Sequence, residues 1–325
     1  MAGAIVVSKV GGPEVLEWKE VDSGTPGSGE VLVRHTAVGL NFIDVYHRTG
    51  LYPLEPPFTP GVEGAGVVEA LGDGVADLKV GDRVAYTGNA GPGSYCELRV
   101  LPRAKLYKLP DTIDDATAAA IMLKGATVEY LVRRTFPVKA GDWALLHAAA
   151  GGVGLLASQW LHALGANVIG TVGSKEKAEL AKKNGCDHVI LYRDEDVPAR
   201  VREITSGRGV DVAYDSVGGA TFMGSLDSLK PRGMMVTFGN ASGPVEPMIP
   251  LELAKRGSLF LTRPRVMDYY SIQADADEGI GALFDVVGSG KVKPHIGRRY
   301  PLAEVAEAHR DLEARRTVGS TVLEV

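Results

Sequence analysis

The sequence contains little cysteine, and this scarcity excludes several classes of protein. Its two cysteines, Cys96 and Cys186, lie far apart, and no Cys-x-x-Cys pair is present. Two thiols cannot form the disulfide framework of a small secreted domain, and they offer no structural zinc site of the usual spacing. We therefore expect both cysteines to be buried, reduced thiols that pack like small hydrophobic side chains.

Long apolar runs and an excess of positive charge are also missing. Glycines or charges interrupt every apolar stretch before it reaches the ~18 residues that a membrane-spanning helix needs. The first residues run directly into a strand pattern and lack the features of a signal peptide. With 35 Lys and Arg against 40 Asp and Glu, the net charge is −5, unlike the basic field of a general nucleic-acid binder. We expect a cytoplasmic protein without a membrane or nucleic-acid partner.

The pattern of secondary structure changes near Asp115, which indicates two domains in the 325 residues. Before this point, short strand-like segments alternate with Gly and Pro turns, as in a partly open antiparallel β-barrel. After it, apolar strands alternate with amphipathic helices, as in a doubly wound parallel sheet of the Rossmann type. The sequence therefore predicts an α/β protein. The strands predicted for the barrel are 4–10, 30–38, 64–70, 82–86, 95–100 and 105–108.

The last part of the chain is too short to form a core of its own, so we assign it to the barrel domain. The predicted limits are 1–124 with 263–325 for the barrel domain and 125–262 for the domain with the parallel sheet. At the junction we expect two apolar helices, 116–123 and 125–134, separated near Gly125.

A glycine-rich segment follows the first strand of the predicted parallel sheet. Ala149-x-Gly151-x-x-Gly154 is a dinucleotide-binding fingerprint with Ala at the first position, and it opens a helix. Gly151 lets the backbone approach a pyrophosphate, and free N–H groups at the helix start favour the anion. We expect Gly151, Gly152 and Val153 to bind the cofactor.

The end of the next strand indicates which dinucleotide is bound. NAD-binding folds place Asp or Glu there to bind the ribose 2′-hydroxyl, whereas this sequence has Gly173 and Ser174, followed by Lys177. A hydroxyl and an ammonium group suit a 2′-phosphate, which a carboxylate would repel. We therefore predict NADPH. The alternative is that the lysines are solvated and Glu176 acts as the acid.

Ligands collect at the carboxyl ends of the strands in such sheets, and further candidates stand there. A tyrosine or a Gly-Asn pair at a strand end also occurs for packing or turn reasons alone. Two arginines from the last part of the chain are expected to reach the cofactor phosphates or the cleft. The candidates are Tyr192, Ser216, Phe238, Gly239, Asn240, Arg263 and Arg315.

These segments, read together, resemble one known family. Asn41-Phe42-Ile43-Asp44, Leu123-Lys124-Gly125-Ala126-Thr127 and the fingerprint at 147–154 are similar to the zeta-crystallin-like quinone oxidoreductase branch of the medium-chain dehydrogenase/reductase superfamily. The resemblance implies a GroES-like barrel domain, NADPH in the cleft between the domains, and a homodimer. In that dimer the edge strand around Ser258–Arg263 would pair with its symmetry mate.

The resemblance also implies that this chain has no catalytic metal. Zinc alcohol dehydrogenases of the superfamily use a Cys and a Gly-His-Glu where this chain has Asn41 and Gly61-Val62-Glu63. Neither asparagine nor valine replaces a thiolate or an imidazole as a zinc ligand. Without a Lewis acid, alcohol oxidation is a poor candidate, and reduction of an electron-poor acceptor is favoured.

The family's residues near the nicotinamide are present here as Asn41, Tyr46, Tyr52 and Thr127, and Phe42 and Leu261 are implied cofactor neighbours. Asn41 would orient a carbonyl with its amide N–H. Tyr46 or Tyr52 would donate a proton, unless the tyrosines only shape the pocket and water supplies it.

The leading hypothesis is an NADPH-dependent quinone oxidoreductase that uses no metal. One alternative is an NADPH-dependent reductase of 2-alkenals or enones. A non-enzymatic alternative is a dinucleotide-loaded structural or RNA-binding protein, against which the acidic balance counts.

Overall fold

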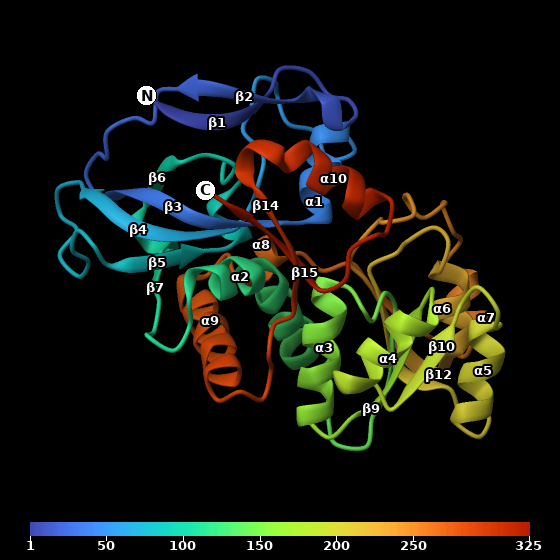
Figure 1. Cartoon of the computed structure of the whole chain (residues 1–325). Helices are drawn as coiled ribbons and strands as arrows, with labels where there is room; N and C mark the ends of the chain where they lie inside the picture. Colours follow the sequence, from blue (N-terminus) through green and yellow to red (C-terminus); the bar gives the residue numbers. More distant parts are fainter. The chain divides into compact units, whose positions relative to one another are not determined.

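The computed structural model describes residues 1–325, which divide into two compact units (Figure 1). The first unit comprises Met1–Ala126, Tyr270–Gly288 and Pro294–Val325, and the second comprises Thr127–Tyr269 and Ser289–Lys293. Both ends of the chain thus belong to the first unit, which contains blue and red segments in Figure 1. The domain limits predicted from the sequence, between residues 124 and 125 and between residues 262 and 263, stay a prediction.

Mostly antiparallel strands build the first unit. A seven-stranded sheet has the order β14-β15-β3-β4-β5-β7, with β6 paired to β3, and β1 and β2 form a separate antiparallel pair. Only β14 and β15 pair in parallel. The strands are β1 (Ala2–Val7), β2 (Leu16–Val21), β3 (Glu30–Leu40), β4 (Gly64–Leu71), β5 (Arg83–Tyr86), β6 (Leu98–Pro102), β7 (Tyr107–Lys108), β14 (Ile296–Pro301) and β15 (Ser320–Glu324).

Four helices accompany these strands: α1 (Phe42–Thr49), α2 (Asp115–Tyr130), α9 (Gln273–Gly288) and α10 (Val305–Glu313), with residues 127–130 of α2 already in the second unit. The prediction of two helices separated near Gly125 was wrong, because α2 runs unbroken through this residue. A Cβ atom on Gly125 would lie 2.4 Å from Cδ1 of Leu283 on α9, so the glycine allows the two helices to pack closely. Short 3-10 turns occur at Pro13–Val15, Gly88–Ala90, Arg103–Lys105 and Leu302–Glu304.

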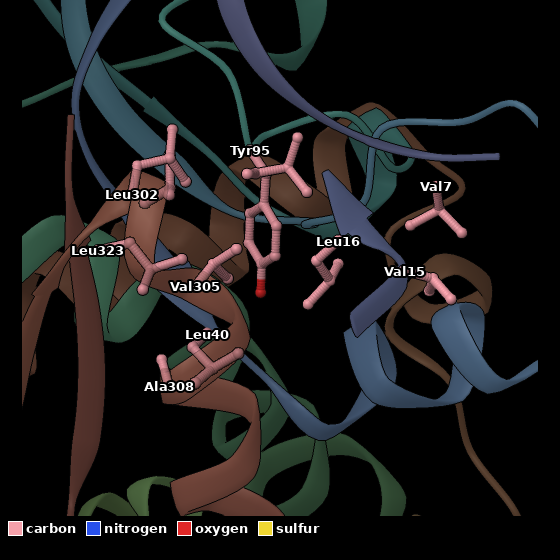
Figure 2. Packing of buried hydrophobic residues seen from close by; sticks show 11 residues of the cluster. Val7, Val15, Leu16, Leu40, Tyr95, Leu302, Val305, Ala308 and Leu323 are labelled. Carbon is pink, nitrogen blue, oxygen red and sulfur yellow. The ribbon is translucent and has the colours of Figure 1, made fainter. Parts of the chain in front are cut away.

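A buried cluster joins the N-terminal strands to the end of the chain. Figure 2 shows the ring of Tyr95 among apolar side chains that include Leu302, Val305 and Leu323. Leu323 comes from β15, Val305 from α10 and Leu302 from the turn before it, and their burial stabilises the unit by the hydrophobic effect. The Tyr95 hydroxyl is itself fully buried and donates a hydrogen bond to Asp44 Oδ2 at 2.7 Å. The core therefore supports the start of α1.

A six-stranded parallel sheet forms the second unit, in the order β10-β9-β8-β11-β12-β13. Numbered along the chain, this is the 3-2-1-4-5-6 order of a dinucleotide-binding sheet, whose order reverses between β8 and β11. The strands are β8 (Trp143–Leu146), β9 (Asn167–Val172), β10 (His188–Leu191), β11 (Val210–Asp215), β12 (Leu229–Thr237) and β13 (Phe260–Thr262). The parallel and antiparallel units confirm the predicted α/β class.

The helices of the second unit are α3 (Gly152–Ala163), α4 (Lys175–Lys183), α5 (Val197–Ile204), α6 (Phe222–Ser228), α7 (Leu251–Lys255) and α8 (Val266–Tyr269). Five of them, α3 to α7, connect these parallel strands, and α8 follows the last strand. A π-helical turn, Leu131–Thr135, follows α2. Both cysteines are buried and free, as expected, and burial raises the pKa of each thiol to about 12.

Candidate functional site

The turn between β8 and α3 has the geometry of an anion site. Gly151 is the N-cap of α3, no side chain caps the helix, and its first turn contains no acidic residue. The first N–H groups of a helix have no partner within the helix, so they stay available to a phosphate. A Cβ atom on Gly154 would lie 2.3 Å from the carbonyl oxygen of Ala148, so only glycine lets α3 begin this close to the strand.

The end of β9 brings four of the predicted cofactor residues together. A Cβ atom on Gly173 would lie 2.6 Å from the Tyr192 hydroxyl, so Tyr192 stands against this turn. Ser174 caps α4, and its hydroxyl accepts a hydrogen bond from the backbone N–H of Lys177 at 3.4 Å. Glu176 lies in the first turn of α4, and hydrogen bonds from its own backbone N–H and from the Ser174 hydroxyl lower its pKa. No carboxylate stands at the strand end itself.

The ends of β11 and β12 meet in a second cluster. A Cβ atom on Gly239 would lie 2.3 Å from the carbonyl oxygen of Ser216, so the two turns lie against each other. Arg263 Nη1 donates to Thr237 Oγ1 at 2.9 Å and to the Gly239 carbonyl at 3.0 Å. This guanidinium therefore supports the turn that also contains Phe238 and Asn240.

In the first unit, Asn41 precedes α1 and its side chain is held by a buried carboxylate. Asn41 Nδ2 donates to Glu63 Oε1 at 2.8 Å and to the Gly39 carbonyl at 3.4 Å. A carboxylate only accepts hydrogen bonds, so the amide must turn its nitrogen toward Glu63. The predicted donation from this amide to a substrate carbonyl would therefore require one of these two bonds to break.

Glu63 is paired with a buried lysine. Lys124 Nζ donates to Glu63 Oε1 at 2.7 Å, and the Leu123 backbone N–H donates to Oε2 at 2.6 Å. The side chains of Lys124 and Glu63 are 7% and 0% exposed, so solvent screens this ion pair little. The pair fixes the carboxylate that in turn fixes Asn41.

A second carboxylate holds the backbone at the same place. Asp44 Oδ2 accepts from the Asn41 N–H at 2.9 Å, while Asp44 Oδ1 is buried without a hydrogen-bond partner. Burial raises the pKa of Asp44 to about 7. The rings of Tyr46 and Tyr52 meet edge to face at 5.1 Å, which brings both predicted proton donors together beside α1.

The other predicted residues lie as follows. Thr127 is in the last turn of α2, where its hydroxyl opposes the rise in the pKa of Tyr130 that burial causes. Phe42 opens α1, and its ring lies 6.2 Å from that of Tyr46. Leu261 is in β13 and 39% exposed, and Arg315 follows α10 with a φ of +59°. Asn41, Phe42, Tyr46, Tyr52 and Arg315 belong to the first unit, and all the other predicted site residues belong to the second.

The residues at the place of the superfamily's catalytic zinc do not fit that ion. Val62 offers no ligand atom, Asn41 turns its amide nitrogen toward Glu63, and Glu63 is already neutralised by Lys124. No group of three or more His, Cys, Asp or Glu side chains is arranged to hold a metal ion.

Comparisons with known proteins identify the family. Residues 27–111 match the alcohol dehydrogenase GroES-like domain, and residues 152–273 match the family described as zinc-binding dehydrogenase. A quinone oxidoreductase of Pseudomonas aeruginosa is 51% identical, with 99% of each chain covered. The chain belongs to the quinone oxidoreductase family. This confirms the resemblance inferred from the sequence motifs and the prediction of a GroES-like domain.

Two further relatives are similar to this chain over almost its full length. The 2-haloacrylate reductase of a Burkholderia species is 48% identical, with 99% of each chain covered. The Escherichia coli quinone oxidoreductase, solved as a complex with NADPH, is 44% identical and has a TM-score of 0.97, with 100% of each chain covered. In the present chain, no helix is both long and apolar enough to cross a membrane.

Sequence reasoning gave no role to several residues of the site. Lys124 stood in a motif that carried the family resemblance and Glu63 stood in the segment compared with the zinc ligands, yet nothing in their positions showed that they form an ion pair. Asp44 belongs to the Asn-Phe-Ile-Asp motif, and a polar residue followed three positions later by an acid is a recognisable helix-start signal. That signal predicts both the start of α1 and the hydrogen bond that Asp44 accepts from the Asn41 N–H.

Proposed function

We propose that this protein is an NADPH-dependent quinone oxidoreductase that transfers reducing equivalents to small quinones or related conjugated acceptors. The observation that carries the proposal is the pair of turns after β8 and β9. One turn offers free N–H groups to a pyrophosphate, and the other offers Ser174 and Lys177 in place of a carboxylate. The NADPH complex of the Escherichia coli relative supports the same cofactor.

The residues of the second unit bind the cofactor in this proposal. Gly151, Gly152 and Val153 hold the pyrophosphate, and Ser174 and Lys177 bind the 2′-phosphate. Tyr192, Ser216, Phe238, Gly239, Asn240, Leu261 and Arg263, with Phe42 and Arg315 of the first unit, complete the set. When bound, NADPH supplies a hydride from its nicotinamide.

The residues beside α1 act on the acceptor. A quinone that has taken up a hydride carries a negative oxygen, and it needs one proton to become the hydroquinone. Tyr46 or Tyr52 donates this proton or orients the water that does so. Asn41 and Thr127 position the reactants, with Asn41 held in place by Glu63.

The second candidate activity is the reduction of an activated carbon–carbon double bond. The 48% identical relative named 2-haloacrylate reductase favours it, because both activities add a hydride to an electron-poor conjugated system. An assay with a panel of quinones and conjugated enones separates the two activities. NADPH oxidation is followed by the absorbance of the reduced nicotinamide, and the products are identified. Quinone turnover without saturated enone product supports the first activity, whereas efficient formation of saturated product supports the second. Loss of activity with a chelator that strips bound metal would contradict both.

We also propose a homodimer formed through Ser258–Arg263, in a cytoplasmic protein. Strand β13 pairs only with β12 and is the edge of its sheet, and Phe260 and Leu261 on it are 58% and 39% exposed. An exposed apolar edge strand favours pairing with a second copy. Light scattering should give a dimeric mass for the native protein and a monomeric mass for Phe260→Lys. A monomeric native protein at micromolar concentration would contradict the dimer.

A further inference from the structure

A buried network of hydrogen-bonded side chains joins four segments of the second unit. We call it the His147 network; it consists of Thr171 on β9, His147 after β8, Ser225 on α6 and Asp215 at the end of β11. His147 Nδ1 lies 2.9 Å from Thr171 Oγ1, and His147 Nε2 lies 2.9 Å from Ser225 Oγ. Ser225 Oγ lies 2.8 Å from Asp215 Oδ2. All four residues are at most 3% exposed.

The charge of Asp215 fixes the direction of every hydrogen bond in the network. The Asp215 carboxylate and the Thr221 carbonyl, 2.8 Å and 3.0 Å from Ser225 Oγ, only accept, so the single proton of the Ser225 hydroxyl is donated to them and not to His147. Ser225 Oγ then accepts from His147 Nε2, which makes His147 the neutral tautomer with its proton on Nε2. His147 Nδ1 therefore accepts from the Thr171 hydroxyl. Burial lowers the pKa of His147, which keeps the imidazole in this neutral form.

Each end of the network is attached to a cofactor turn. Asp215 Oδ1 accepts from the backbone N–H groups of Val217 at 2.8 Å and Gly218 at 3.0 Å, which shapes the turn around Ser216. The Thr171 carbonyl accepts from the Ala149 N–H at 3.1 Å, in the turn that leads to Gly151. Thr171 also stands just before Gly173 and Ser174 on the same strand.

We propose that the His147 network is a positioning device that holds these three turns in one arrangement, so that breaking it weakens NADPH binding. Its side chains act through the turns and not by touching the substrate, and this inference rests on the proposed function. Both ring nitrogens of His147 are engaged within the network, which excludes the imidazole as a general base for the acceptor.

The chain offers a closely matched pair of variants for the test. Thr171→Val keeps the shape of the side chain and removes the hydroxyl, whereas Thr171→Ser keeps the hydroxyl. Ser225→Ala breaks the network on the other side of His147. The dissociation constant of NADPH, measured by quenching of protein fluorescence, should rise about 3- to 10-fold in Thr171→Val and Ser225→Ala and stay near the native value in Thr171→Ser.

Two further readouts distinguish positioning from general destabilisation. The KM for the quinone at saturating NADPH should stay unchanged, because the network does not contact the acceptor. The double variant Thr171→Val with Ser225→Ala should bind NADPH no more weakly than the weaker-binding single variant, since one break already separates the Thr171 end of the network from the Asp215 end. Thermal unfolding of each variant is measured as a control, to show that the variant is folded at the temperature of the binding measurement.

The outcomes separate this inference from the function on which it rests. If the native protein binds NADPH and both Thr171→Val and Ser225→Ala bind it within twofold of the native affinity, the positioning role is overturned and the proposed function stands. If Thr171→Ser loses affinity as much as Thr171→Val does, the hydroxyl is not the cause, and the positioning role fails as well. If the native protein does not bind NADPH, the proposed function fails and this inference falls with it.

Discussion

Each unit contains a buried polar cluster beside residues predicted to act at the site, but the two clusters differ in charge. In the first unit, Lys124, Glu63 and Asp44 surround Asn41, and one oxygen of Asp44 has no hydrogen-bond partner. In the second unit, the His147 network contains one carboxylate, Asp215, both oxygens of which accept hydrogen bonds. The contribution of a charged, incompletely paired cluster to stability changes with the ionisation of its groups. The contribution of a fully hydrogen-bonded network depends on the positions of its donors and acceptors. The first unit should therefore respond to pH and charge substitutions, and the second to the loss of single hydroxyl groups.

The largest effect should come from breaking the ion pair of the first unit. Lys124→Met leaves Glu63 buried without its cation, and we expect the free energy of unfolding to fall by about 3–5 kcal/mol. Urea denaturation measures this change. The matched double variant, Lys124→Met with Glu63→Gln, removes the unpaired charge and should recover a large part of the loss. Equal stability of Lys124→Met and the native protein would show that the pair does not support the fold.

The next effect concerns pH and Asp44. Its pKa is about 7 in the folded chain against an ordinary value of 3.8. Between these values the folded state keeps a proton that the unfolded state loses, so the contribution of Asp44 to stability falls as the pH rises and levels off above about 7. Relative to Asp44→Asn, the native protein should lose roughly 3 kcal/mol between pH 5 and pH 8.

The comparison with Asp44→Asn removes the influence of the groups around this carboxyl. Tyr95, Glu63 and Lys124 face it, and His309 lies beyond Tyr95 with a pKa lowered to about 3 by burial. His309 favours the folded state above its ordinary pKa and loses that contribution as the pH falls, in both proteins alike. Identical pH dependence in the two proteins would contradict the raised pKa of Asp44.

The smallest effect should appear in the second unit, where backbone conformation rather than charge is at stake. Ala148 has a φ of +53°, a conformation that glycine adopts without steric cost. Ala148→Gly should stabilise the protein by about 0.5 kcal/mol, after the entropy that glycine adds to the unfolded chain is subtracted. The control is Ala150→Gly in the same turn, which has no positive φ and should destabilise. A loss of stability in Ala148→Gly would show that the turn is not strained.

The sequence predicted the second unit better than the first, for physical reasons. A parallel strand is apolar throughout, and the turn at Gly151 has a fixed form, so β8, this turn and α3 were recognisable locally. Strand β2 was not predicted, because Glu17, Trp18, Lys19 and Glu20 are all exposed on it and show no alternation. Gly125 suggested a break in a helix, although it serves the packing of α2 against Leu283.

The two buried polar clusters could not be predicted from the sequence, for a different reason. Glu63 and Lys124 stand 61 residues apart, and only the folded first unit brings their side chains to 2.7 Å. His147 precedes the glycine-rich turn, and nothing in the sequence showed that its partners Thr171 and Ser225 would come from separate elements. Tertiary structure alone decides which buried polar groups pair, whereas local sequence decides where a phosphate-binding turn begins.

The preference between NADPH and NADH tests the central claim most directly, because that claim is recognition of a 2′-phosphate at the end of β9. The native protein should show a kcat/KM for NADPH at least about tenfold above that for NADH, since a hydroxyl and an ammonium group bind the extra phosphate. Ser174→Asp, which places a carboxylate at this strand end, should reverse the preference, while Ser158→Ala, a buried serine on α3, should not. A native protein that prefers NADH, with Ser174→Asp leaving the ratio unchanged, would contradict the account.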